Sequence, residues 1–375
     1  MKKVLVLKVR FKGFSEEWKE DTIGNIANIT NGKLDANAMV KSGMYNFYTS
    51  GIDVYKIDKY SFEGQGISIA GNGVNMGYMH LVSGKYNAYQ RTYILNNIKI
   101  DRHFLFYNLW KNFWEFCQKN TREGSIPYLL YNDISDFKIF KSHSNEQQKI
   151  GKLLDQISNL ITLEEIKHNK LKQLKQTLLQ KMFPEYNSKI PRIRFKGFEG
   201  EWKEEKLDDI FKVITGGEPP KNYKNSKHPV GKYKYPIYSN GQEANAIWGF
   251  SDNYSINTEA ITISSIGTIG FPVVRKMFFT PIIRLKTLLP YNKNMNINFL
   301  NLSVSQINFS FNQAGIPSMN SNQLKDNIIL ISRNFSEQQK IGDFFSKIDI
   351  LINLYQSKLN KLKQIKKALI NKMLL

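Results

Sequence analysis

The chain has 375 residues, 41% of them apolar and 13% aromatic, so it is long enough for two globular domains and too apolar to be disordered. Its net charge of +21 predicts a polyanionic partner, above all nucleic acid, although a generally Lys-rich and Asn-rich proteome would leave the same mark. A single cysteine, Cys117, excludes an internal disulfide and favours a cytoplasmic location. The apolar stretch after Met1 is too short for a signal peptide, and no run approaches the roughly 20 residues of a membrane span, so we expect no membrane association.

The chain reads as two tandem copies of one half-protein. Residues 9–14, with the sequence Val-Arg-Phe-Lys-Gly-Phe, return as Ile-Arg-Phe-Lys-Gly-Phe at 193–198, and a Glu-Trp-Lys-Glu element follows each motif at 17–20 and 201–204. Weaker matches pair 29–32 with 214–217, 48–51 with 238–241, 66–70 with 260–264, and 124–127 with 315–317. Residues 221–235 form a Lys-, Tyr- and Asn-rich insertion without a clear counterpart. We therefore predict a common frame with divergent loops.

Each frame reads as mixed α and β structure. Alternating or β-branched runs predict strands at 66–70, 89–95, 260–264 and 281–285. Helical patterns cover 104–118 and 297–309, and Gly- and Asn-rich turns cover 71–77 and 264–270. The inward side of the first helix is predicted to comprise Phe104, Leu105, Tyr107, Leu109 and Trp110. The expected fold class is α+β, with two similar mixed domains in tandem, each followed by a long helix.

The two long helices, at 144–183 and 336–374, begin with the same sequence, Glu-Gln-Gln-Lys-Ile-Gly, and close on Lys-Met. After the first turn neither contains Gly or Pro. Apolar residues alternate four and three apart, as in a heptad seam, which Glu164, His168 and Lys175 interrupt in the first helix. The seam residues are Ile150, Leu154, Ile157, Ile161, Leu171, Leu178 and Met182 in the first helix, and Ile341, Phe345, Ile348, Ile352, Tyr355, Leu359, Leu362, Leu369 and Met373 in the second. This shared period predicts that the helices pack on each other; the alternative is two separate amphipathic helices, each lying on its own domain.

A search for catalytic chemistry gives only weak patterns. Residues 62–66 fit the Phe-x-Gly-x-Gly pattern of S-adenosylmethionine binders, but the segment before them is charged and the segment after them is strand-like, so the required strand and helix are missing. Glu-x-Lys at 17–19 and at 201–203 imitates half of a nuclease site without a Pro-Asp partner, and the five histidines have no zinc-ligand spacing. We therefore expect no catalytic residue, no metal site and no cofactor bound by this chain.

Over essentially the whole chain, the two Arg-Phe-Lys-Gly-Phe motifs and the two Glu-Gln-Gln-Lys-Ile-Gly helices resemble the specificity subunit of type I restriction-modification systems. The resemblance implies target recognition domains at 1–143 and 184–335, each reading one half of an asymmetric double-stranded DNA target. It implies that the helices at 144–183 and 336–375 form an antiparallel coiled coil that spaces the domains. Two methyltransferase subunits would dock on this non-catalytic frame and restriction subunits would join them, with S-adenosylmethionine, ATP and Mg²⁺ bound in those partners.

DNA contacts are predicted from residue type and loop position, because Asn, Gln and Arg suit base edges while Lys suits phosphate. In the first domain the candidates are Asn72, Asn75, Lys85, Tyr89, Gln90, Arg91 and Arg122. In the second domain they are Lys221, Asn222, Tyr223, Lys224, Lys227, Lys232, Arg275, Lys276 and Arg284. The alternatives at this point are a nucleic-acid-binding module unrelated to restriction and a self-contained methyltransferase-like enzyme.

Overall fold

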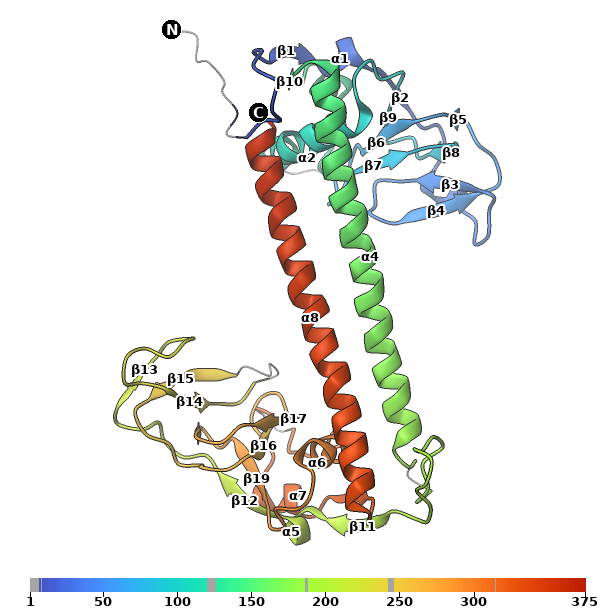
Figure 1. Ribbon diagram of the computed structural model, residues 1–375. Helices are drawn as coiled ribbons and strands as arrows, with labels where there is room; N and C mark the ends of the chain where they lie inside the picture. The colour runs from blue at the N-terminus through green and yellow to red at the C-terminus, as the bar shows by residue number, and fades with distance from the viewer. Residues whose placement is uncertain (1–6, 8, 120–125, 186–187, 242–245, 314) are drawn as a thin grey trace. The chain divides into compact units, whose positions relative to one another are not determined.

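The computed structural model describes residues 7, 9–119, 126–185, 188–241, 246–313 and 315–375. The chain divides into two compact units (Figure 1). Unit 1 comprises Met1–Lys167 and Gln356–Leu375, and unit 2 comprises His168–Tyr355. The boundary falls within both long helices. Each unit therefore contains one globular domain together with part of each long helix.

The globular domain of unit 1 is built on an antiparallel sheet of order β2-β9-β6-β7. Strand β6 is buried along its whole length, and α2 packs Leu105, Leu109 and Phe113 into the same core as Ile67 and Ile69 of β6. A second sheet has the order β4-β3-β8-β5 with β3 and β8 parallel, and β1 pairs with β10. The elements are β1 (Lys19–Thr22), α1 (Ile23–Ile26), β2 (Asn28–Asn31), a 3₁₀ turn (Ala36–Ala38), β3 (Tyr45–Tyr48), β4 (Val54–Ile57), β5 (Phe62–Glu63), β6 (Gly66–Ala70), β7 (Met79–Val82), β8 (Lys85–Ala88), β9 (Thr92–Asn96), α2 (Arg102–Lys119), α3 (Tyr131–Ser135), β10 (Lys138–Lys141) and the long helix α4 (Ser144–Met182).

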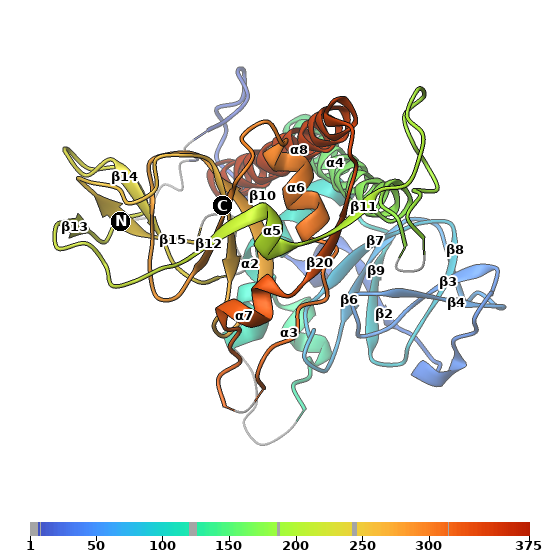
Figure 2. The ribbon, with the colours of Figure 1, turned by 90° about the horizontal axis from the view of Figure 1, so that it is seen from below.

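Unit 2 repeats this plan, but its second sheet differs at both edges. The order β12-β19-β16-β17 matches the antiparallel sheet of unit 1, and β14 and β18 are again parallel. The extra strand β13 adds to β15, on the edge opposite to the one that β5 occupies in unit 1. Helix α6 packs between the sheet and α8 (Figure 2). The elements are β11 (Lys203–Lys206), α5 (Leu207–Ile210), β12 (Phe211–Thr215), β13 (Tyr223–Lys224), β14 (Tyr235–Tyr238), β15 (Ile247–Ser251), β16 (Ala260–Ser264), β17 (Gly270–Arg275), β18 (Thr280–Pro281), β19 (Lys286–Pro290), α6 (Ile297–Val304), α7 (Ser321–Lys325), β20 (Ile328–Ile331) and the long helix α8 (Phe335–Met373).

The repeated motifs meet in the fold and attach the start of each long helix to its own domain. In unit 1 the Arg10 guanidinium donates to both carboxylate oxygens of Glu146, each at 2.8 Å. In unit 2 Arg194 donates to Glu337 in the same way, at 2.6 and 2.8 Å. Both glutamates are fully buried, so the bidentate pair compensates for the removal of each carboxylate from water. The Arg-Phe-Lys-Gly-Phe and Glu-Gln-Gln-Lys-Ile-Gly motifs thus recur together because they are two halves of one contact.

The glycine of each Glu-Gln-Gln-Lys-Ile-Gly motif allows a close helix crossing. A Cβ added to Gly151 would lie 2.3 Å from Oδ1 of Asp101 and 2.9 Å from the amide nitrogen of Phe104, at the start of α2. A Cβ added to Gly342 would lie 2.2 Å from Oδ1 of Asn296, at the start of α6. The missing side chain therefore lets each long helix pass directly over the N-terminus of the helix that covers its sheet.

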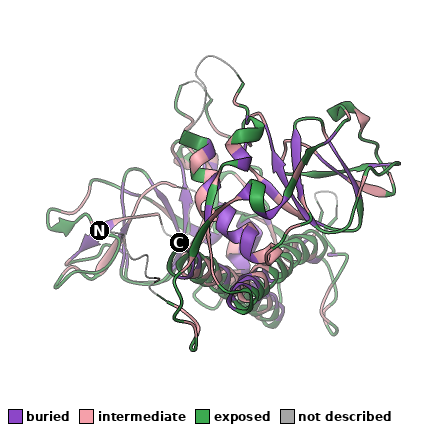
Figure 3. Cartoon of the chain, turned by 90° about the horizontal axis from the view of Figure 1, so that it is seen from above, coloured by how far each residue is buried: buried purple, intermediate pink, exposed green. Residues whose placement is uncertain are grey.

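The two long helices, each 39 residues long, pack against each other as an antiparallel coiled coil. In unit 1, Lys358 of α8 lies 3.0 Å from the carboxylate of Glu164, at the interruption in the seam of α4, while Leu154 and Met373 share one core cluster nearer the start of α4. In unit 2, Lys175 pairs with Asp349 at 2.5 Å, and Met182 shares a core with Phe345 nearer the start of α8. All the predicted seam residues are buried or half-buried. At both ends the seam also packs on a globular domain. Buried residues are drawn along the strands and the shorter helices of the domains in Figure 3.

Several local predictions need correction. Of the strand predicted at 281–285, only Pro281 lies in a strand, because β18 ends there and residues 282–285 connect it to β19. The helix predicted at 297–309 ends at Val304. Trp110 is 37% exposed and stacks on Phe106 and Trp114 instead of facing inward. The repeat at 29–32 shifts by one residue, so that Gly32 corresponds to Gly216 rather than to Gly217. Each of these two glycines packs against the backbone at the end of a parallel strand, β8 or β18. Among the predicted repeat residues, Gly124 and Ser125 lie outside the described part of the chain.

Candidate nucleic-acid interface

Three chain segments are hydrogen-bonded together at one end of the main sheet in unit 1. They are the turn before β9, the loop after β6 and the segment before α3, and we call residues 71–73, 89–91 and 127–129 corner 1. The Gly71 amide donates to the Arg91 carbonyl at 2.8 Å, and the Leu129 amide donates to the Gly71 carbonyl at 2.7 Å. The Gly73 amide donates to the Pro127 carbonyl at 2.8 Å. The backbone that carries Arg91 is therefore fixed although its side chain is exposed.

The same arrangement recurs in unit 2, where we call residues 265–267, 282–284 and 317–319 corner 2. The Ser265 hydroxyl donates to the Arg284 carbonyl at 2.6 Å, and the Met319 amide donates to the Ser265 carbonyl at 2.9 Å. The Gly267 amide donates to the Pro317 carbonyl at 2.8 Å. The Arg284 side chain, like that of Arg91, is exposed.

Strand register makes Arg91 and Arg284 structurally equivalent. Each arginine lies three residues before the residue that pairs with the centre of the buried strand of its sheet. These register pairs are Ile94 with Ser68 and Thr287 with Thr262. The two domains therefore present the same side chain at the same point of the same frame.

The turn of corner 2 is strained and tightly held. Ile283 has φ of 51° and Arg284 has φ of 59°, a left-handed conformation that is unusual for any non-glycine residue and most unusual for a β-branched one. Their amides donate to the carbonyls of Gly217 and Gly216, both at 2.8 Å, and the Asn240 side-chain amide donates to the Ile283 carbonyl at 2.5 Å. Such strain persists only where the surrounding contacts impose it, and it is concentrated at ligand-contacting positions.

The residues beneath the two arginines differ. In corner 1, Tyr93 donates its hydroxyl to the Leu129 carbonyl at 3.0 Å and lines, with Arg91, a pocket of about 220 Å³. Strand register places Lys286 at the position of Tyr93, with Nζ donating to the hydroxyls of Thr215 and Ser321 at 3.0 and 2.9 Å. Burial, and then the charge of Arg284, lower the pKa of Lys286. The two corners share a backbone frame, but the side chain beneath the arginine is neutral Tyr93 in corner 1 and Lys286 in corner 2.

Four other described candidates of the first domain, Asn72, Asn75, Tyr89 and Gln90, lie on or beside corner 1, whereas Lys85 does not. Asn72 accepts from Ser50 at 2.5 Å, Gln90 donates to Asp35 at 2.9 Å, and Tyr89 and Asn75 are half-buried. Lys85 lies at the start of β8 over the ring of Tyr60, with Nζ 4.6 Å from the centroid. Arg122 lies outside the described residues. The structure thus groups five of the predicted side chains and leaves Lys85 on the second sheet.

In the second domain, the insertion forms an exposed basic surface rather than part of corner 2. Lys221, Lys224 and Lys227 are exposed, and Tyr223 packs on Trp248 with ring centroids 4.5 Å apart. Asn222 is exposed beside them, whereas Lys232 pairs with Asp252 at 3.1 Å. Aromatic rings interleaved with unpaired lysines suit a phosphate backbone better than a protein core. We call residues 221–227 the basic insertion.

Arg275 departs from the predicted surface position, because it is only 5% exposed. Its guanidinium lies 3.9 Å from the ring centroid of Tyr238, and Nε donates to Thr262 at 2.9 Å. Burial lowers the pKa of Arg275. Its role in this structure is to hold the two sheets together, and the adjacent Lys276 is exposed.

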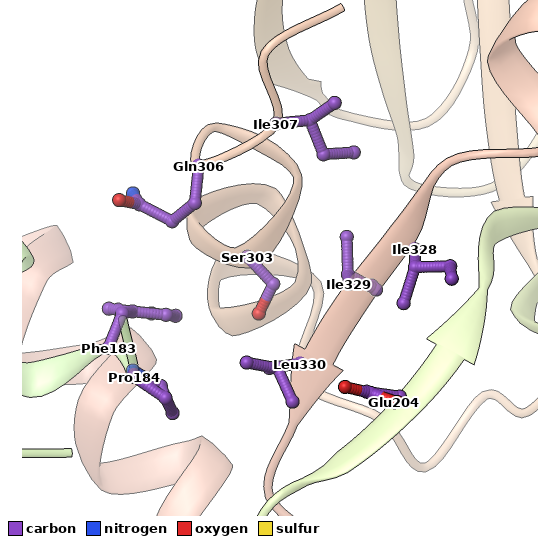
Figure 4. Close-up of a pocket in the computed structure, with 9 residues that line it drawn as sticks. All are labelled: Phe183, Pro184, Glu204, Ser303, Gln306, Ile307, Ile328, Ile329 and Leu330. Atoms are coloured by element: carbon purple, nitrogen blue, oxygen red, sulfur yellow. The ribbon is translucent and has the colours of Figure 1, made fainter. Parts of the chain in front are cut away.

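Outside the two corners, the described residues include one mainly apolar pocket and one buried cysteine. A pocket of about 350 Å³ at the end of α4 has mostly apolar walls, with Glu204, Ser303 and Gln306 as its polar side chains (Figure 4). Burial raises the pKa of the Cys117 thiol to about 12, which makes it a poor nucleophile. Within the described ranges, no three His, Cys, Asp or Glu side chains gather as metal ligands, and no helix has the length and apolarity of a membrane span. Residues 62–66 join β5 to β6 and precede no helix, so the S-adenosylmethionine-like pattern lacks its structural context.

Sequence reasoning missed the residues that organise the corners. Ser50 lies two residues after β3 and donates its hydroxyl to the side chain of Asn72, in the loop after β6. Asn240 lies two residues after β14, donates to the Ile283 carbonyl and accepts from the Ser265 amide. Ile126 and Ile316, one residue before the matched prolines, are 70% and 73% exposed. The signal was present in the internal repeats at 48–51, 238–241 and Ile-Pro, which were interpreted only as frame.

Two like domains on an antiparallel helix pair, each with a fixed polar corner and its own loops, define a class of tandem recognition protein. The family model for the type I restriction modification DNA specificity domain matches residues 15–173 and again 199–364. The chain therefore belongs to the family of type I restriction-modification DNA specificity domains and contains two copies in tandem.

Individual relatives are distant. The chain is 28% identical over 238 residues to the type I restriction enzyme EcoDI specificity subunit of Escherichia coli, covering 56% of this chain and 53% of that protein, so the match spans about half of the relative's length. It is 28% identical to the putative type I specificity subunit S.MpnORF507P of Mycoplasma pneumoniae, over 85% of this chain and 86% of that protein. The crystal structure of the type I restriction-modification S subunit from M. genitalium aligns over 99% of both chains with a TM-score of 0.76 at 18% identity, a likeness in fold.

Proposed function

We propose that this chain is the DNA-specificity subunit of a type I restriction-modification complex, with one recognition domain for each half of an asymmetric bipartite target. The observation that carries the proposal is the duplicated corner. Arg91 and Arg284 occupy equivalent positions in two domains whose surrounding loops differ. Equivalent frames suit the same task, and unlike loops suit unlike base sequences.

The helix pair would serve as the spacer and as the docking frame. Leu160, Leu163 and Ile166 of α4 are 39–54% exposed in unit 1, and Ile350 and Leu354 of α8 are 58% and 60% exposed in unit 2. Apolar residues that lie outside the seam at this density favour a protein partner. We assign these faces to two methyltransferase subunits, through which restriction subunits would join.

The chemistry would then belong to the partners. S-adenosylmethionine would be bound by the methyltransferase subunits, and ATP and Mg²⁺ by the restriction subunits, whereas this chain would select the DNA and catalyse nothing. A cytoplasmic location follows from that assembly, because the target is chromosomal or invading DNA. The domain limits proposed for the two readers are 1–143 and 184–335.

The test is to co-express the full chain with type I methyltransferase subunits from the same genome and to sequence the methylated adenines. One bipartite motif that disappears with the gene is the expected result. Methylation without a motif, or a motif that persists without the gene, would overturn the proposal. Inserting one heptad into both α4 and α8 preserves the seam and should change the gap between the half-sites while leaving both half-sequences unaltered.

A further inference from the structure

We infer that Arg91 and Arg284 read a guanine at corresponding positions of the two half-sites, so that an otherwise asymmetric target shares one G·C pair in each half. This inference rests on the proposed function and deepens it. It starts from three features that the two corners have in common: position, exposure and a fixed backbone.

The positions of the two arginines are set by the strand register of the main sheet in each unit. Register pairs place both arginines three residues before the same point of β9 or β19. Two domains of one fold that bind two half-sites in the same manner bring equivalent positions to equivalent bases. The same side chain at both positions therefore predicts the same base in both halves.

Hydrogen bonds fix the backbone of both arginines. The Arg91 carbonyl is held by Gly71, and the Arg284 carbonyl by Ser265. In corner 2 the left-handed φ angles at Ile283 and Arg284, which Gln90 and Arg91 of corner 1 do not share, indicate that contacts rather than local preference set the geometry of that turn. Base readout needs such a fixed origin, whereas a phosphate contact tolerates a mobile one.

The side-chain chemistry selects guanine. An arginine fork donates two parallel hydrogen bonds to O6 and N7 of guanine in the major groove, which no other base presents as paired acceptors. Lysine lacks the fork, and glutamine instead fits adenine. The residue before each arginine differs, Gln90 in corner 1 and the 45% exposed Ile283 in corner 2, so the neighbouring base need not be shared.

The experiment uses the full chain assembled with its methyltransferase subunits, selecting bound duplexes from a random library and sequencing them. The wild type should enrich a bipartite motif with one G·C pair at matching places in the two halves. R91A should lose the guanine preference in one half only, and R284A in the other, each lowering affinity for the selected site roughly 5- to 150-fold. R91Q and R284Q should move the preference at that position towards adenine.

Controls separate the possible failures. Arg333→Ala changes an exposed arginine between β20 and α8 and should leave the motif intact. If the wild type enriches no bipartite motif, the proposed function itself fails. If the wild type does enrich one, but R91A and R284A leave its bases unchanged or weaken all sequences alike with a salt slope lower by about 1, the arginines contact phosphate and this inference is overturned.

Discussion

The two globular domains agree where they meet the long helices and differ where they face outward. Each attaches the start of its long helix by an arginine–glutamate pair, Arg10 with Glu146 and Arg194 with Glu337. By contrast, the second sheet ends on β5 in unit 1 and, at the opposite edge, on β13 of the basic insertion in unit 2. The attachment to the long helices is thus repeated residue by residue, whereas the outward loops vary within one protein.

Such a division follows from the physics of each contact. A buried carboxylate tolerates no substitution that removes its partner, because the charge is then left unpaired away from water. An exposed loop on a hydrogen-bonded frame can change its side chains without changing the core. Substitutions can therefore test the shared attachment to the long helices and the divergent loops separately.

Removing the buried carboxylate should have the largest effect, and a similar one in both units. Glu146→Ala strands Arg10, and Glu337→Ala strands Arg194, so each should lower the free energy of unfolding by about 3 kcal/mol. Urea denaturation followed by tryptophan fluorescence measures the loss, and hydrogen exchange assigns it to one unit. Gln148→Ala, an exposed change two residues further along α4, is the control. A cost confined to one of the two glutamates would break the equivalence of the two frames.

Neutralising the basic insertion should affect DNA binding and leave folding unchanged. Lys221, Lys224 and Lys227 changed together to Gln should weaken binding on the order of 10- to 100-fold and reduce the slope of log affinity against log salt by up to about 2.7. Fluorescence anisotropy of the assembled complex at several salt concentrations measures both. A charge-matched control changes Lys347, Lys361 and Lys367 on α8. Equal losses in the two triple variants would show a diffuse charge effect rather than a contact of the insertion.

The sequence predicted the frame because internal duplication doubled its signal. Heptad spacing and the recurrence of two motifs identified the long helices, and the buried strands β6 and β16 appeared at the predicted residues. The pairing of Arg10 with Glu146 was not predicted, because neither motif alone specifies its partner across 136 positions of chain.

The corners were only partly predictable. Arg91 and Arg284 were candidates by residue type, but their equivalence requires the register of β9 and β19. Arg275 shows the opposite case, since a cationic residue at the end of a strand looked exposed and is covered by Tyr238. Local composition does not indicate that an arginine is buried against an aromatic ring.

Filling the helix crossing should have a moderate effect. Gly151→Ala and Gly342→Ala place a methyl group against the capping side chains Asp101 and Asn296, which accept from the amides of Phe104 and Phe299. Although alanine favours a helix, displacing the cap should leave each variant about 1 to 2 kcal/mol less stable. Thermal unfolding measures the change. A variant as stable as the wild type would mean that the crossing relaxes without cost.

The smallest expected effect is a difference between the two units in their sensitivity to acid. In the β1–β10 ribbon, Asp21 pairs with Lys141 at 2.5 Å, and hydrogen bonds from Lys141 and then Asn25 lower the pKa of Asp21 to about 2. The ribbon of unit 2 has Ile331 at the position of Lys141.

Because the pKa of Asp21 is lower in the folded chain than the usual value of about 3.9, the pair stabilises unit 1 fully above about pH 5. That stability is lost as the pH falls through 4 towards 2. With Lys141 partly exposed to solvent, the contribution should be about 1 kcal/mol. Asp21→Asn and Lys141→Met should each remove this contribution at pH 6. Each should also flatten the dependence of unit 1 stability on pH between 5 and 2. Hydrogen exchange in the β1–β10 ribbon measures both effects. If the two variants differ from each other in this range, the ion pair is not the group that titrates, and the acid response of unit 1 comes from elsewhere in its frame.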